Sequence, residues 1–197
     1  MKANTMIMKL NNITSVLGLG AALAMLASGC VTSPGPVLTP TDEASMNTAA
    51  TAALKNLYAN NPAAKALGSK ARAILIFPDV LKGGFMIGAQ LGNGVLRQNG
   101  RTAGYYNIVA ASYGWQVGIQ QFGYALFLMN DSAMAYLNNT DGWQVGVGPS
   151  IVVMDQGMAR SIDTTTVQKD VYAFIFDQSG LMAGTGLQGS KITRIQP

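Results

Sequence analysis

The first part of the chain with a clear pattern shows apolar residues at helical spacing. Between residues 46 and 57 they recur every three or four positions, which predicts an amphipathic helix over about residues 42–59. Thr41 is a candidate N-cap, because a threonine side chain there accepts a bond from a free backbone N–H. A second, short helix is expected to begin at Pro62, where a missing N–H costs nothing, and to end near Gly68.

From residue 73 the pattern changes to apolar runs and alternations typical of strands. Residues 73–77 form a short apolar run closed by a proline, as expected of a buried strand. Residues 85–91 and 95–97 flank Gly92-Asn93-Gly94, a sequence typical of hairpin turns. We therefore predict one strand before this point and a hairpin around it.

A long alternating segment follows at residues 105–129. Its apolar parity changes at Gln120-Gln121, which indicates a β-bulge. Asp131 or Ser132 is expected to cap a short helix that runs through Met134 and Leu137. The remaining alternating or apolar stretches predict further strands at residues 143–154, 171–177 and 181–188.

A five-residue pattern occurs twice: Gly114-Trp-Gln-Val-Gly118 returns as Gly142-Trp-Gln-Val-Gly146. We interpret the two copies as strands with the same role, each with an apolar Trp/Val face. Glycine inside a strand is unfavourable unless the sheet bends or another group comes close. The sequence therefore predicts an α+β fold with a strongly coiled, barrel-like antiparallel sheet, N-terminal helices and one short helix between strands. A cavity for an acyl chain is the alternative explanation of the glycines.

Composition excludes much chemistry. The 197 residues include no histidine, one cysteine and one glutamate, and only 11% are charged. Ser-His-Asp and Cys-His catalysis both need an imidazole, and ordinary zinc sites need several His or Cys. Residues 184–189 match G-x-G-x-x-G, but only eight residues follow and none is acidic, which disfavours a dinucleotide site. We predict a protein that is not an enzyme and that has no cofactor and no metal.

The N-terminus has the pattern of an export signal. Lys2 and Lys9 are followed by an uncharged stretch with an apolar segment at residues 16–27, shorter than the ~20 residues of a spanning helix. It ends in Leu26-Ala-Ser-Gly-Cys30, which resembles the lipobox of bacterial lipoproteins. The resemblance implies cleavage after Gly29 and acylation of Cys30, for example with palmitate. The alternative is a plain secretory signal with an accidental cysteine.

This resemblance divides the chain into a signal at 1–29, a lipidated tether at 30–40 and a domain at 41–197. Val31 stands where an aspartate would imply retention at the inner membrane. The lipobox resemblance therefore implies a lipid-anchored protein of the bacterial outer membrane, facing the periplasm or the cell surface.

Three separated blocks of the domain resemble the SYLF family. The first is Ala73-Ile-Leu-Ile-Phe-Pro78 with Lys82-Gly-Gly-Phe85 and Gly92-Asn-Gly-Val-Leu96. The second is Gln116 to Gln120 followed by Leu126-Phe-Leu-Met-Asn130, and the third is Ser179-Gly-Leu-Met-Ala-Gly-Thr-Gly-Leu-Gln-Gly-Ser190. The resemblance covers about residues 41–195. It implies a lipid-binding module, since eukaryotic SYLF proteins bind phosphoinositides and some bind actin. It implies no catalytic activity.

Charge supports a lipid partner over a nucleic acid. Without Lys2 and Lys9 the chain keeps 11 Lys and Arg against 9 Asp and Glu, too small an excess for a nucleic-acid binder. Seven basic residues and one acid lie between residues 55 and 101. We expect part of this region to bind anionic phospholipid headgroups. The candidate residues near the first helix-to-strand junction are Lys65, Lys70, Arg72 and Lys82.

The rival hypothesis is a structural or protein-interaction lipoprotein of the cell envelope without a specific lipid ligand. In that case a protein partner would bind an aromatic surface. Its candidate residues are Tyr105, Tyr106, Trp115 and Trp143.

Overall fold

The computed structural model describes residues 38–139, 142–145, 147–154 and 169–195. Residues Gly35–Pro197 form one compact unit. The expected signal segment, Cys30 and the tether up to residue 37 lie outside the described residues. The lipid anchor therefore stays a prediction.

The two N-terminal helices form as expected, with α1 starting slightly early. Helix α1 (Pro40–Asn60) is capped by Thr39 rather than Thr41, because Thr39 forms a reciprocal capping box with Asp42. Helix α2 (Pro62–Gly68) begins at the predicted proline, and the Asn61 side chain caps it. Among the described residues, none of the helices has both the length and the apolar character needed to cross a membrane.

Three long strands make up most of the sheet: β1 (Ala73–Gln98), β2 (Arg101–Leu128) and β5 (Val171–Ile195). Two short strands, β3 (Trp143–Gln144) and β4 (Ile151–Met154), both pair with β5. The order is β1-β2-β5-β3 with antiparallel pairing, and β4 alone is parallel to its neighbour. The α+β fold with a coiled, largely antiparallel sheet is therefore confirmed.

The predicted hairpin at Gly92-Asn93-Gly94 was wrong. These residues lie inside β1, and the chain turns six residues later at Asn99-Gly100, where both residues have positive φ (51° and 75°). Gly94 has a different role, because a Cβ there would come within 2.6 Å of the Phe77 ring. The sequence contains two Asn-Gly pairs, Asn93-Gly94 and Asn99-Gly100. The first lies where the later part of β1 packs closely against its earlier part, and only the second forms the turn.

The later strands also differ from the prediction in extent. The expected strands at 171–177 and 181–188 are one continuous strand, β5, and the expected strand at 143–154 is divided into β3 and β4. The bulge predicted at Gln120-Gln121 is confirmed nearby, since the β2–β5 register shifts between Gln121 and Gly123. Helix α3 (Asp131–Leu137) is confirmed, but its N-cap is Asn130 rather than Asp131 or Ser132, because the Asn130 side chain accepts from the Ala133 N–H.

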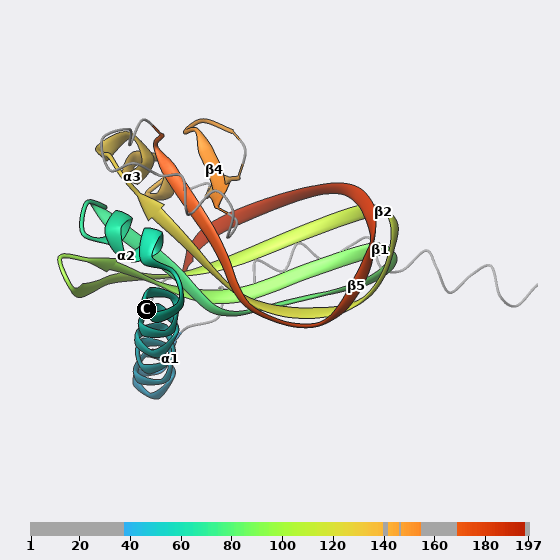
Figure 1. Ribbon diagram of the computed structural model, residues 1–197, viewed down its shortest axis with the longest axis horizontal. Coiled ribbons are helices and arrows are strands. Elements are labelled where there is room, and N and C mark those ends of the chain that lie inside the picture. The colour runs from blue at the N-terminus through green and yellow to red at the C-terminus, as the bar shows by residue number, and fades with distance from the viewer. Residues whose placement is uncertain (1–37, 140–141, 146, 155–168, 196–197) are drawn as a thin grey trace, which may run out of the picture. The chain divides into compact units, whose positions relative to one another are not determined.

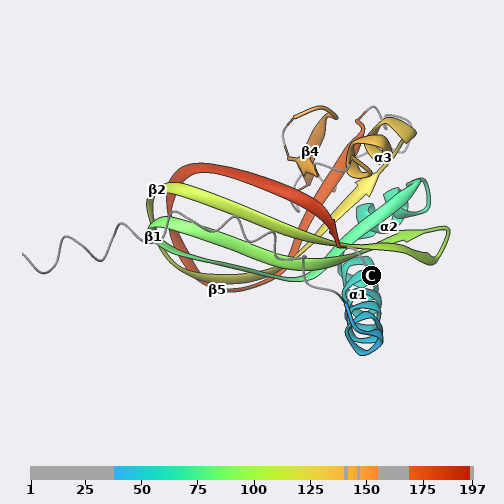
Figure 2. The same ribbon diagram turned by 180° about the vertical axis from the view of Figure 1, so that it is seen from behind.

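Each long strand bends in its middle, so that the sheet curls back over itself (Figures 1 and 2). The part of β1 before the bend pairs with the second half of β2, and the part after it pairs with the first half. Met86 of β1 (φ 61°) and Gly180 of β5 (φ 83°) have positive φ at the bend. We call the bent region the arch; it comprises residues 80–92, 108–121 and 179–190.

Two buried clusters hold the curled sheet together. The inner cluster fills the space between the two limbs of the curl and includes Phe77, Tyr106 and Leu126. The outer cluster lies where α1 and α2 cover the sheet, and the Phe127 ring packs there against Phe174 with a centroid distance of 5.0 Å. Both clusters lie mostly at the helical end, and Val80 and Ile108 extend the inner cluster into the base of the arch.

One aspartate joins three elements near the start of β5. The Asn130 amide donates to the Asp170 carboxylate at 2.6 Å, and the backbone N–H and hydroxyl of Ser150 each donate to it at 2.8 Å. The bond from Asn130 first, and then those from Ser150, hold the pKa of Asp170 below its usual range. The carboxylate is thus ionised at neutral pH and ties α3, β4 and β5 together.

Candidate functional site

A cleft of about 800 Å³ opens beside α1, α2, the start of β1 and the β1–β2 turn. Four basic residues from separate parts of the chain line it: Lys55, Lys65, Arg72 and Arg97. None of the described residues that line the cleft is acidic. Its walls also carry apolar groups, among them Leu54, Tyr58 and Ile74. The cleft thus offers positive charge above an apolar wall.

The helices bring the two lysines to the cleft. Lys55 lies on α1, and Lys65 lies in the last turn of α2, where a cation is favourable near the negative end of the helix. The Tyr58 side chain packs so closely against Gly68, at the end of α2, that a Cβ there would overlap its hydroxyl. Burial raises the pKa of the Tyr58 phenol, so it stays protonated and able to donate a hydrogen bond.

Arg97 is held rigidly by its neighbours. Its guanidinium donates to the Thr102 hydroxyl at 3.0 Å and to the Thr51 hydroxyl at 2.8 Å. It also donates to the backbone carbonyl of Asn47 at 3.0 Å, which joins the end of β1 to α1. Arg97 therefore supplies a fixed positive charge at the cleft wall.

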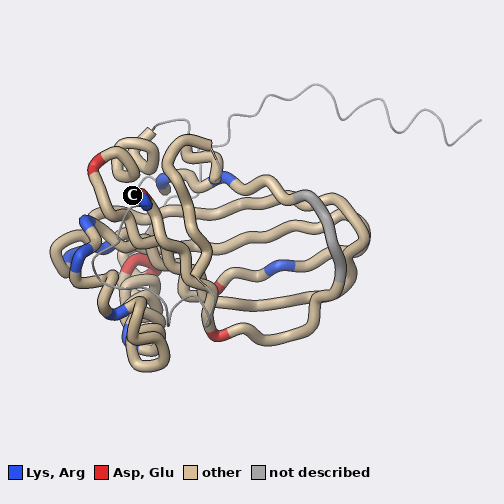
Figure 3. The backbone as a smooth tube through the Cα atoms, turned by 45° about the horizontal axis from the view of Figure 1, so that its top comes forward, with Lys and Arg blue, Asp and Glu red and all other residues tan. Residues whose placement is uncertain are grey.

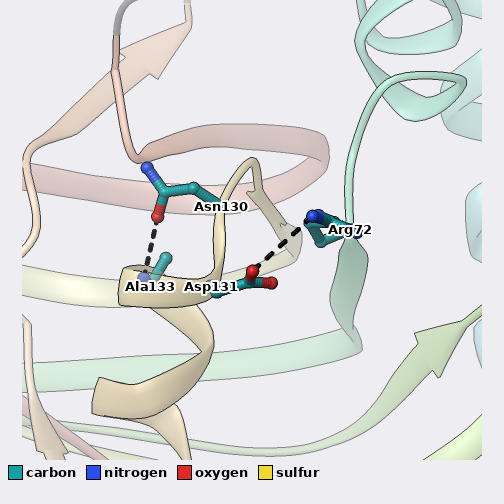
Figure 4. A network of polar contacts seen from close by, with 4 residues as sticks. All are labelled: Arg72, Asn130, Asp131 and Ala133. Carbon is teal, nitrogen blue, oxygen red and sulfur yellow. Dashed lines mark hydrogen bonds and ion pairs between the residues drawn. The ribbon is translucent and has the colours of Figure 1, made fainter.

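Arg72 is held more loosely. Its guanidinium lies 3.5 Å from the Asp131 carboxylate at the start of α3, and both side chains are well exposed (62% and 84%) (Figure 4). Such exposed ion pairs contribute about 0–1 kcal/mol. An anion in the cleft can therefore compete for Arg72 at little cost, whereas Asn130 and Ala133 keep Asp131 in place through the helix cap.

The structure brings together two of the four predicted site residues. Lys65 and Arg72 line the cleft, and Lys70 lies in the turn between α2 and β1. Lys82 does not join them, because β1 continues past Phe77 and carries it into the arch, where its ammonium donates to Gln188 at 2.7 Å. Figure 3 shows that most of the described charged residues lie at the helical end.

Sequence reasoning missed two residues of the cleft. Lys55 and Arg97 belong to the basic region between residues 55 and 101, but their place depends on long-range packing. Arg97 reaches α1 only because the β1–β2 hairpin folds back against that helix. The one signal in the sequence was the position of Lys55 on the predicted helix just before that of Lys65, which could have placed Lys55 near the same junction.

The predicted aromatic surface is not formed. Tyr105 (9% exposed), Tyr106 and Trp143 (1%) are buried, whereas Trp115 is 81% exposed. The interpretation of the repeated Gly-Trp-Gln-Val-Gly pattern as two strands with one role was therefore wrong. Its first copy crosses the arch, and its second packs Trp143 into the inner cluster.

A curled sheet covered by helices, with a basic cleft and no group of three metal-binding side chains among the described residues, defines an α+β domain suited to binding. Residues 109–196 match the family model Ysc84, described as Las17-binding protein actin regulator. This match confirms, over residues 109–196, the resemblance to the SYLF family that the sequence shows. The family is described by binding rather than by a catalysed reaction. No curated protein matches the chain.

Proposed function

We propose that the domain binds anionic lipid headgroups through the basic cleft. The observation that carries this proposal is the convergence of Lys55, Lys65, Arg72 and Arg97 on one cavity without an acidic lining residue. The match to the SYLF family supports a binding role, and the proposal adds the ligand class.

The chemistry of the cleft matches a phosphate attached to an apolar body. Arginine recognises phosphate oxygens through paired N–H groups, and lysine adds a flexible point charge. The cavity of about 800 Å³ lies within the usual range of ligand sites, about 300–1,000 Å³. Leu54 and Ile74 offer the glycerol and upper acyl carbons an apolar wall.

Removing two lysines from the cleft should weaken binding to anionic membranes. Each basic residue near an anionic surface contributes about 1 kcal/mol, so Lys55→Gln with Lys65→Gln should cost roughly 30-fold in affinity. Flotation of residues 35–197 with phosphatidylglycerol vesicles at low salt measures this, with phosphatidylcholine vesicles as the baseline.

The matched control is Lys169→Gln with Lys191→Gln, which removes the same charge from residues that do not line the cleft. We expect this control to bind anionic vesicles nearly as well as the unmodified fragment. Equal losses in the two variants would reduce the effect to net charge and would refute the cleft as the site. A stoichiometric protein captured in place of lipid would favour the rival function.

We further propose that the domain is anchored in the bacterial outer membrane through acylated Cys30. The lipobox-like sequence Leu26-Ala-Ser-Gly-Cys30 supports this. Cys30→Ser should abolish incorporation of labelled palmitate and release the protein from the membrane fraction. Unchanged labelling of this variant would contradict the anchor.

A further inference from the structure

The outer face of the arch is apolar and uncovered. Six large apolar residues on this face, from all three long strands, are 66–88% exposed: Phe85, Ile87, Tyr113, Trp115, Ile119 and Leu181. In an antiparallel sheet with one face in water, that face is normally polar. The arch has the reverse arrangement on its outer face.

Toward its tip the inner face of the arch is polar, whereas Val80, Ile108 and Ala110 near its base are buried apolar residues. Gln90, Ser112 and Gln116 are 5–8% exposed, although glutamine and serine are mostly surface residues. The Gln116 amide donates to the Ser112 hydroxyl at 2.7 Å. A Cβ on Gly88 would come within 2.6 Å of that hydroxyl, so the glycine leaves room for the pair. This lining also disfavours an acyl-chain cavity inside the arch.

Lys82 and Gln188 continue this inner polar lining. The Lys82 ammonium donates to the Gln188 side chain at 2.7 Å, and the Gln188 amide donates to Gln90 at 3.2 Å. Residues 83–96, 102–130 and 178–190 contain no Asp, Glu, Lys or Arg, so the nearest other charges, Asp79, Asp177 and Lys191, lie at the base of the arch. Toward its tip the arch is thus polar inside, apolar outside and almost free of charge.

From this inversion we propose that the arch enters the outer part of a lipid bilayer, with its apolar face against lipid. The exposed residues lie on both limbs of the bend: Ile87 and its β2 partner Tyr113 lie on one limb, and Ile119 and its β5 partner Leu181 lie on the other. The outer faces of the limbs point in different directions (Figures 1 and 2). A flat protein partner would cover one limb, whereas a lipid phase surrounds both.

The edges of the sheet limit the depth of insertion. In the arch, β1 and β5 form strand ladders only with β2, apart from the Val145 N–H that donates to the Ser190 carbonyl at 3.0 Å at its base. Both outer edges of the sheet are therefore open over most of the arch. Open sheet edges are not tolerated deep in hydrocarbon. The arch therefore inserts to about 5–10 Å, as interfacial elements do, with Trp115 and Tyr113 near the headgroups.

The arch lies at the end of the sheet far from α1 and α2 (Figures 1 and 2), the helices whose residues line the basic cleft. One flat membrane does not contact both at once, and insertion of the arch does not rest on the cleft. Insertion needs no anionic lipid and resists salt, whereas headgroup binding needs both negative charge and low salt. An experiment can therefore refute insertion of the arch without refuting headgroup binding by the cleft, and the reverse.

The test uses residues 35–197 with neutral phosphatidylcholine vesicles at high salt. The unmodified fragment is expected to float with the vesicles, and the combination Phe85→Ser, Trp115→Ser and Leu181→Ser to bind at least tenfold less. The control is Tyr136→Ser, Val147→Ser and Val153→Ser, three exposed apolar residues outside the arch. It should float like the unmodified fragment.

Flotation of the arch variant at the unmodified level would overturn the proposal. The proposal would also be overturned if the unmodified fragment did not bind vesicles but formed a dimer, and the arch variant stayed monomeric. The apolar face would then bind a second copy of the chain. If circular dichroism shows that the arch variant is unfolded, the tryptophan fluorescence of the unmodified fragment tests the proposal instead. A blue shift of its emission maximum on addition of vesicles, absent from the Trp115→Phe variant, supports insertion. An emission maximum that does not move on addition of vesicles overturns the proposal.

Discussion

Trp143→Ala should lower the free energy of unfolding by about 3–5 kcal/mol, the usual cost of removing a buried aromatic side chain. Trp143 is 1% exposed and packs in the inner cluster with α3 residues and Ile192 of β5. Its indole N–H also donates to the Val147 carbonyl at 3.1 Å, a bond that alanine removes. Urea unfolding of the fragment 35–197 measures the loss.

Trp115→Ala is the matched control, because it removes the same side chain from the same five-residue pattern. Trp115 is 81% exposed, so the unfolding free energy should change by no more than about 0.5 kcal/mol. Similar losses from the two substitutions would mean that the arch tryptophan is also buried, and would contradict the polarity assigned to the arch.

Gly118→Val should destabilise the domain by at least about 2 kcal/mol, from backbone strain and overpacking together. Gly118 has a φ of 134°, which a valine adopts only with strain. A Cβ there would also overlap the Leu181 carbonyl oxygen and lie 2.9 Å from the Met182 Cα. Both neighbours are backbone atoms of the paired strand, so they move only by disturbing the β2–β5 pairing.

Gly189→Ala provides the comparison within the same region. A Cβ on Gly189 would meet no atom within 4 Å, and the residue lies in β5 without a positive φ. Its unfolding free energy should stay within about 0.5 kcal/mol of the unmodified fragment. Equal tolerance of the two substitutions in urea unfolding would show that the curl does not need a glycine at 118.

Local signals predicted the helices and the general sheet architecture well. Pro62 and the apolar spacing of α1 act within a few residues, so their effect is readable in sequence. The hairpin was misplaced because two Asn-Gly pairs carry the same local signal. Only the packing of Gly94 against Phe77 shows that the first pair lies inside β1 and that the second pair forms the hairpin turn.

The cleft and the arch depend on contacts between distant segments, and the sequence predicted them in part. Lys65 and Arg72 were found because they are close in the chain to the junction that forms the cleft. Arg97 was not, because its bond to Thr51 spans 46 residues. The alternation of β2 was visible, but alternation does not say which face points inward. That choice exposes Trp115 and buries Gln116.

Quenching of tryptophan emission by lipids brominated at known acyl positions tests most directly whether the domain places its apolar arch in a bilayer. In neutral vesicles, bromines near the headgroup should quench the unmodified fragment more strongly than bromines deep in the acyl chains. Trp115→Phe should lose this quenching, since the remaining Trp143 is buried in the protein. Equal, weak quenching of both proteins at every bromine depth would contradict insertion.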